Sequence, residues 1–226
     1  SADTGRTWRR ETLNSKLGVW GDPCVVTDSL GHFYYFHLSN TPGSENAYDR
    51  IVCQKSYDNG ISWNKGSYLG LNKDLSQDKH WAAVDLKSNN IYIAWSQLKD
   101  KTISGKSDSD ILFSVSKDLG RTWSMGVRIN QESGTGYAKG KIVLGAMPAI
   151  GPNGEIYTVW SSEKGIIFDK SLDTGKTWME EDITIANFSK PGWSFEIPGV
   201  YRCYSFPVIA CDISNGEFRG NIYITW

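Results

Sequence analysis

Four residues near the ends of apolar runs have the types needed for acid–base or nucleophilic chemistry. Asp22 and Asp78 each precede such a run. A carboxylate in that place can exchange a proton, accept a hydrogen bond from a hydroxyl group, or cap a turn before a strand. Glu163 and Tyr204 have the residue types of a nucleophile pair, although nothing in the sequence places them together. These four residues are the candidate catalytic set.

A second group of side chains suits ligand binding. Guanidinium groups bind a carboxylate in a bidentate manner, imidazole binds hydroxyls or moves a proton, and loop aromatics stack on sugar rings. For the histidine in a strand the structural alternative is a half-buried polar strand end. For the loop aromatics it is packing of the loop onto the sheet. The candidate ligand-binding residues are Arg50, Arg202, His37, His80, Trp81 and Trp193.

Several other functions lack their sequence features. The chain has no P-loop, HExxH, GxSxG or CxxC motif, and its three scattered histidines do not form a metal-binding pattern. We therefore expect neither cofactor nor metal. The 24 basic residues balance 25 acidic ones, which gives no reason to expect nucleic acid as a partner. No apolar run reaches about 18 residues, so no transmembrane helix is expected.

One motif, S-x-D-x-G-x-[ST]-W, occurs four times, starting at Ser1, Ser56, Ser116 and Ser171. Such a regular spacing indicates stacked structural units. The Asp accepts hydrogen bonds from nearby backbone N–H groups, the Gly supplies a positive φ, and the Trp begins the next strand and buries its ring. These roles are structural. The residues that fill them are Asp3, Gly5, Trp8, Asp58, Gly60, Trp63, Asp118, Gly120, Trp123, Asp173, Gly175 and Trp178.

Apolar runs of strand length lie between successive copies of the motif. Two runs joined by a turn come first, as in 23–28 and 33–37, and a third, such as 51–54, leads into the motif. Each unit is therefore expected to have four short strands, with the motif as the turn between the third and fourth. Such units arranged radially form a β-propeller. A sandwich is the alternative, but it has no reason to repeat one turn at near-constant spacing.

The predicted fold is thus all-β, a propeller of four-stranded antiparallel blades and part of a six- or seven-bladed ring. The expected units are 1–17 (the end of a blade), 18–75, 76–140 and 141–190 (whole blades), and 191–226 (the start of a blade). The chain has four cysteines. An even number in an exported protein favours disulfides, and the alternative is that they are small buried residues of strands. They are Cys24, Cys53, Cys203 and Cys211.

The four motifs resemble the Asp-box, or bacterial neuraminidase repeat, of the sialidase-like superfamily. The resemblance covers essentially the whole chain, and in general appearance the chain is similar to exported Asp-box proteins of Bacteroidetes-type bacteria. It implies a secreted or cell-surface protein that meets carbohydrate or a cell-surface protein. Sialidases of this superfamily use an arginine triad, a Tyr nucleophile with a Glu partner, and an Asp acid/base. Of the eight arginines here, only Arg50 and Arg202 fall on the expected site face.

Three functions are compatible with these features. The favoured hypothesis is an exported propeller that recognises glycan or a protein partner on its loop face, without catalysis in this segment. The first alternative is an exo-sialidase or related glycoside hydrolase. The second is a structural scaffold or secreted cargo module.

Overall fold

The chain is built from β-strands and connecting loops. The computed structural model describes residues 1, 3–40, 42–43, 48–99, 108–135, 141–188 and 194–226. Every named element within these ranges is a strand. In the same ranges, no helix is long and apolar enough to cross a membrane.

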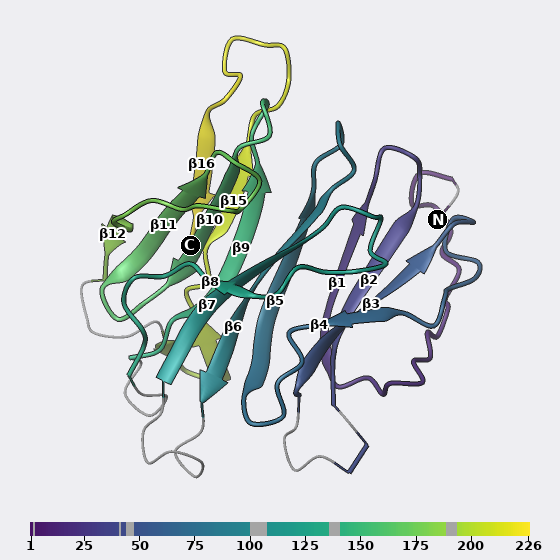
Figure 1. Cartoon of the computed structure of the whole chain (residues 1–226), viewed down its shortest axis with the longest axis horizontal. Helices are drawn as coiled ribbons and strands as arrows, with labels where there is room; N and C mark the ends of the chain where they lie inside the picture. The colour runs from purple at the N-terminus through teal and green to yellow at the C-terminus, as the bar shows by residue number, and fades with distance from the viewer. Residues whose placement is uncertain (2, 41, 44–47, 100–107, 136–140, 189–193) are drawn as a thin grey trace.

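Three antiparallel four-stranded sheets follow one another along the chain, each with its strands in sequence order. We call them blades 1, 2 and 3 (Figure 1). Blade 1 contains β1 (Gly21–Thr27), β2 (Phe33–Ser39), β3 (Arg50–Ser56) and β4 (Ser67–Leu69). Blade 2 contains β5 (Ser76–Val84), β6 (Ile91–Lys99), β7 (Asp108–Ser116) and β8 (Val127–Arg128). Blade 3 contains β9 (Leu144–Ile150), β10 (Ile156–Ser161), β11 (Gly165–Ser171) and β12 (Ile183–Asn187).

A hairpin of β15 (Val208–Cys211) and β16 (Ile222–Thr225) forms a partial fourth blade. The first strands β1, β5, β9 and β15 contact one another in that order, so they line a common inner edge (Figure 1). The fourth strands lie at the outer edge. This radial stacking is the β-propeller predicted from the repeats, and the expected strands of each blade are confirmed.

The core lies between the blades because both faces of the middle strands are apolar. In β6, Ile93 and Trp95 pack against blade 1, whereas Tyr92 and Ala94 pack against blade 3. Successive side chains of a strand point to opposite faces, so alternating contacts of this kind need apolar residues at nearly every position. The fourth blade packs on blade 3 through a third cluster that includes Ile209.

The repeated turns of blades 2 and 3 join each of these blades to the one before it. The ring of Trp123, in blade 2, lies 5.7 Å from that of Phe36 in blade 1, and its Nε1 donates to Ser67 Oγ at 3.0 Å. Trp178, in blade 3, packs on Phe113 in blade 2 with 4.9 Å between ring centroids. Trp8 differs from the expectation of a buried ring: it is 80% exposed, because none of the described residues covers it.

Each turn is held by its Asp in the predicted way. Asp58 accepts a hydrogen bond from the backbone N–H of Ser62 at 2.8 Å, and Ser56 Oγ donates to the same carboxylate. Gly60 has φ of 82°. The preceding Asn59 also has a positive φ, 58°, and the other three turns repeat this pair of left-handed residues. Two consecutive positive φ values match the right-handed twist of the flanking strands.

Two features differ from or extend the expectations drawn from the sequence. The long segment before the fourth blade, expected to be a loop, contains a hairpin of β13 (Ser194–Ile197) and β14 (Val200–Tyr204), with Gly199 at φ 81° in the turn. All four cysteines are free thiols. Cys24 and Cys53 both pair with Phe36 of the strand between them, so about 10 Å separates their Cα atoms, too far for a disulfide.

Candidate functional site

The same irregularity occurs near the start of the first strand in each whole blade. Two residues of the first strand there oppose one residue of the second, which is a β-bulge. The opposed residues of the second strands are His37, Trp95 and Trp160. The bulged pairs are Asp22–Pro23, Lys79–His80 and Gly145–Ala146. Bulges re-aim side chains, so these positions present different groups at the inner edge from those a regular strand would present.

The first residue of each bulge has a left-handed backbone. Its φ is 52° at Asp22, 50° at Lys79 and 73° at Gly145. Such values are uncommon for residues other than glycine and cluster at functional sites. At Gly145 a Cβ would lie 2.6 Å from the ring of Phe206, so blade 3 has no room for a side chain there. Charged bulge residues therefore occur only in blades 1 and 2 among the three whole blades.

The two charged bulges meet in one ion-pair cluster. Lys79 Nζ lies 2.8 Å from Asp22 Oδ2 and 3.0 Å from Asp78 Oδ1. The cluster lines a cavity of about 200 Å³, together with Trp20, Gly21, Leu38 and Tyr48. The Asp78 side chain is 7% exposed and that of Asp22 is 34% exposed. Asp22 is therefore the carboxylate that a ligand in the cavity can reach.

The environment separates the pKa values of the two carboxyl groups. Burial raises the pKa of Asp78 above its usual range, and the charge and hydrogen bond of Lys79 offset this only in part. At Asp22, burial acts in the same direction, but the hydrogen bond and charge of Lys79 outweigh it and lower the pKa. The pKa of Lys79 is raised: burial opposes its charge, but its two carboxylate partners prevail. Carboxyl groups with opposed shifts are suited to acid and base roles.

Two buried histidines lie behind this cluster. His80, 3% exposed, follows Lys79 in the bulge, and burial lowers its pKa to about 4. Within the described part of the chain, neither ring nitrogen of His80 makes a hydrogen bond of normal geometry. His37 is also buried, and its Nδ1 lies 3.0 Å from the Leu38 carbonyl oxygen. Burial lowers the pKa of His37 as well, so both rings are neutral at pH 7.

The arginines predicted to bind a carboxylate do not line this cavity. Arg50 is buried at the start of β3, with its Nε 2.7 Å from Asp49 Oδ1 and its guanidinium 5.1 Å from the centre of the Tyr68 ring. Arg202 belongs to β14, and its side chain lies outside what the structure describes. Trp193 also falls outside the described residues. Trp81 follows the bulge on β5 and is 42% exposed.

Glu163 and Tyr204 lie in neighbouring parts of the structure, near blade 3. Glu163 lines a groove of about 520 Å³ beside blade 3, where it pairs with Lys141 at 2.8 Å. Across this groove Lys164 pairs with Glu132 at 2.6 Å. Tyr204 is not among the lining residues, and its ring packs 5.1 Å from that of Phe206. Tyr204 and Phe206 pack against the cluster of Ile142 and Leu144, and Ile142 lines the groove, so Tyr204 lies next to the groove that Glu163 lines.

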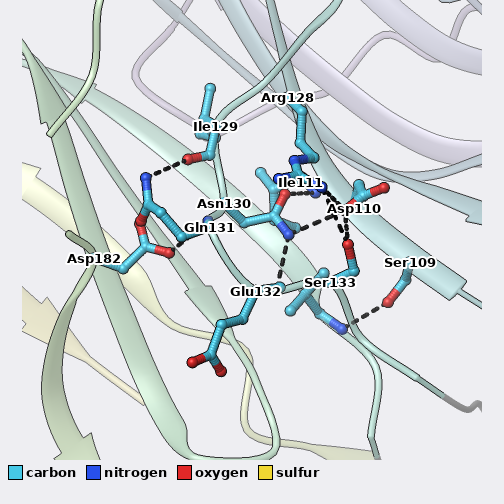
Figure 2. A network of polar contacts seen from close by, with 11 residues as sticks. Ser109, Asp110, Ile111, Arg128, Ile129, Asn130, Gln131, Glu132, Ser133 and Asp182 are labelled. Atoms are coloured by element: carbon cyan, nitrogen blue, oxygen red, sulfur yellow. Dashed lines mark hydrogen bonds and ion pairs between the residues drawn. The ribbon is translucent and has the colours of Figure 1, made fainter. Parts of the chain in front are cut away.

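One wall of the groove is fixed by a polar network (Figure 2). Asn130 accepts a hydrogen bond from the backbone N–H of Ile111 at 2.7 Å and donates to Asp110 at 3.2 Å. The N–H of Gln131 donates to Asp182 at 3.0 Å, which ties the wall to blade 3. These bonds give the connection between blades 2 and 3 a defined path. They account for the conformation of the wall without requiring a ligand.

Of the predicted site residues, the structure thus brings together Asp22 and Asp78, with His80 behind them. Lys79 was the residue that sequence reasoning missed. It lay in the expected loop but received no role, and its only signal was a base placed directly after Asp78. Its contact with Asp22 depends on the bulges, which the residue pattern does not reveal.

No protein-family model and no curated protein sequence matches the chain. Solved structures do resemble it. A Hadza microbial sialidase has a TM-score of 0.60 and 16% identity over 93% of this chain and 42% of its own. An α-L-arabinofuranosidase from Fusarium graminearum has a TM-score of 0.62 and 14% identity over 84% of this chain and 52% of its own. An α-L-arabinanase from Penicillium chrysogenum has a TM-score of 0.58 and 16% identity over 100% of this chain and 65% of its own.

These similarities establish a fold of the kind found in β-propeller glycoside hydrolases. At this level of identity they carry no information about catalytic residues. The chain spans less than two thirds of the length of each of these three enzymes.

Proposed function

We propose that this chain belongs to an exported Asp-box propeller that recognises carbohydrate at the inner edge of blades 1 and 2. The observation that carries the proposal is the shared contact of Asp22 and Asp78 with Lys79 at the cavity between two successive bulges. Strained charged residues concentrated in a concave site are typical of ligand binding. The sialidase and arabinanase named above, which share the fold, add support for a glycan as the ligand.

The cavity offers the groups that bind a sugar. Asp22 is the exposed carboxylate and accepts hydrogen bonds from hydroxyl groups. Trp20, 57% exposed, offers an aromatic surface to the apolar face of a sugar ring, and Tyr48 is also part of the lining. Asp78 holds Lys79 in place from the buried side, so its part is to position the ammonium group.

Glycan hydrolysis is the second candidate, and the opposed pKa shifts favour it. In this candidate Asp78, whose pKa is raised, donates the proton and Asp22, whose pKa is lowered, acts as nucleophile or base, which requires the Asp78 side chain, 7% exposed here, to become accessible to the ligand. Because both bound oxygens lie within 3.0 Å of one nitrogen, they are closer together than the roughly 6.5–9.5 Å of inverting enzymes. Hydrolysis at this pair would therefore retain the anomeric configuration.

One experiment separates the candidates. The full-length protein is screened on a glycan array, and its best ligands are then incubated with it while released reducing sugar is measured. Binding that falls at least tenfold in Asp22→Asn, without turnover in the wild type, supports recognition. Turnover that Asp78→Asn abolishes supports hydrolysis. Absence of both would overturn the carbohydrate proposal in favour of a scaffold or a protein partner.

A further inference from the structure

We propose that the cavity at Asp22 accepts an uncharged sugar residue and discriminates against sugars that carry a carboxylate, such as sialic acid. This inference rests on the proposed carbohydrate site and specifies the class of sugar that it takes. It follows from the charges at the cavity, the engagement of its one ammonium group, and the size of the space.

The charge at the cavity is negative. Its lining contains two carboxylates, Asp22 and Asp78, and within the described residues Lys79 is the only cation on its walls. An ammonium group has three N–H donors, and two of those of Lys79 already point to carboxylates at 2.8 and 3.0 Å. One donor remains for a hydroxyl group. The carboxylate of a bound acidic sugar would be repelled by the negative charge of Asp22, and the lining offers no unpaired cation to balance it.

The guanidinium group of blade 1, that of Arg50, is committed elsewhere. Arg50 directs its Nε to Asp49 Oδ1 at 2.7 Å and a terminal nitrogen to Asp49 Oδ2 at 3.4 Å. Both groups are buried, and the guanidinium also lies over the Tyr68 ring. Bidentate binding of a sialic acid carboxylate needs a guanidinium group that is accessible to the ligand. Binding it here would require Asp49 to release Arg50.

The size of the cavity limits the ligand to a small group. Its volume of about 200 Å³ is below the approximately 300 Å³ at which pockets for drug-sized ligands begin. It therefore holds one sugar residue, with the rest of a chain outside. Trp20 is exposed beside the cavity, in a place where it can cover the apolar face of an uncharged ring.

Matched sugars test the inference. Dissociation constants of the full-length protein are measured by calorimetry for a panel of neutral oligosaccharides that includes arabinobiose and lactose, and for sialyllactose. We expect at least one neutral sugar to bind at least tenfold more tightly than sialyllactose. In the double variant Asp22→Asn, Asp78→Asn, Lys79 loses both partners, so this preference should shrink at least tenfold. Asp74 is exposed and does not line the cavity, so Asp74→Asn is the control that makes the same substitution elsewhere. Circular dichroism verifies that all variants fold.

The possible failures are distinguishable. Tighter binding of sialyllactose by the wild type overturns the inference but leaves carbohydrate recognition standing. A neutral preference that Asp22→Asn, Asp78→Asn changes no more than Asp74→Asn does would show that the sugar binds elsewhere, and would overturn the assignment to this cavity. Absence of binding to every sugar would overturn the proposed function together with the inference.

Discussion

The ammonium group of Lys79 lies 2.8 Å from the carboxylate of Asp22, so one ion pair joins the first strands of blades 1 and 2. Lys79 also balances Asp78, whose side chain is 7% exposed. Its removal leaves that carboxylate buried without a counter-charge. We therefore expect Lys79→Met to lower the free energy of unfolding in urea by about 3–5 kcal/mol.

Asp22→Asn removes the more exposed partner and leaves the Lys79–Asp78 pair intact. Its expected cost is about 0–1 kcal/mol. The surface substitution Asp74→Asn gives the baseline. Equal losses in Lys79→Met and Asp22→Asn would show that burial of Asp78 does not depend on the ammonium group.

His80 should make stability depend on pH. Its pKa is about 4 in the folded chain, against 6.5 for an ordinary histidine, because it is buried. Below pH 6.5 the unfolded chain binds a proton that the folded chain does not bind until about pH 4, so stability falls as the pH decreases through this window. The loss attributable to His80 is about 3 kcal/mol. Asp22, His37 and Lys79 also act on this ring electrostatically.

Other groups titrate nearby, so the measurement is a difference. Asp78 has a raised pKa and contributes with the opposite sign, because its folded form holds a proton longer than its unfolded form. Subtracting the pH profile of His80→Gln from that of the wild type isolates His80. A difference that stays constant between pH 4 and 6.5 would contradict a buried neutral ring.

The glycine of a repeated turn is required for close packing as well as for its backbone. Gly175 has φ of 83°, and a Cβ there would overlap the ring of Phe113 in the preceding blade. Gly31 has a similar φ of 81° but nothing within 4 Å of its Cβ position. Gly31→Ala should therefore cost about 1–2 kcal/mol through its backbone alone. Gly175→Ala should cost about 1–3 kcal/mol more through overpacking. Chemical denaturation compares them, and equal losses would argue against the contact with Phe113.

The repeats made the fold predictable because each turn depends on local chemistry. Asp58, Gly60 and Ser62 interact within a few residues, so their spacing in the sequence already specifies the geometry. The apolar runs of strand length supplied the rest, as in β6, where Tyr92 to Trp95 pack alternately against blades 3 and 1. The β13–β14 hairpin was missed because its turn residues, Pro198 and Gly199, lie in the segment before the fourth blade that was expected to be a loop.

The site was less predictable because it depends on contacts between blades. The sequence shows that Asp22 and Asp78 each precede an apolar run, but their common partner Lys79 becomes evident only from the bulges in β1 and β5. The pairing of Arg50 with Asp49 was likewise hidden, since neighbours in a strand normally point to opposite faces. Such relationships are set by backbone geometry, which residue types alone do not determine.

Asp169 gives a last test, of a carboxylate that is buried for structural reasons. Its Oδ1 accepts hydrogen bonds from the N–H groups of Lys170 and Met179, at 2.6 and 3.0 Å, which fixes the residue after Trp178. Its Oδ2 has no partner within the described part of the chain, and burial raises its pKa to about 6. Above pH 6 the folded chain therefore holds a poorly compensated charge. An acid with a raised pKa stabilises the fold less as the pH rises from 3.8 through 6.

The variant Asp169→Asn keeps the Oδ1 acceptor and replaces the unpartnered oxygen with a donor. Thr158 pairs directly opposite on β10, and its Oγ1 also lacks a partner among the described residues. We expect the variant to raise the free energy of unfolding by about 1–3 kcal/mol at pH 8 and to change it little at pH 4. Urea unfolding at both pH values, with Asp74→Asn as control, measures this. Equal effects at pH 4 and pH 8 would mean that Asp169 titrates alike in the folded and unfolded chains.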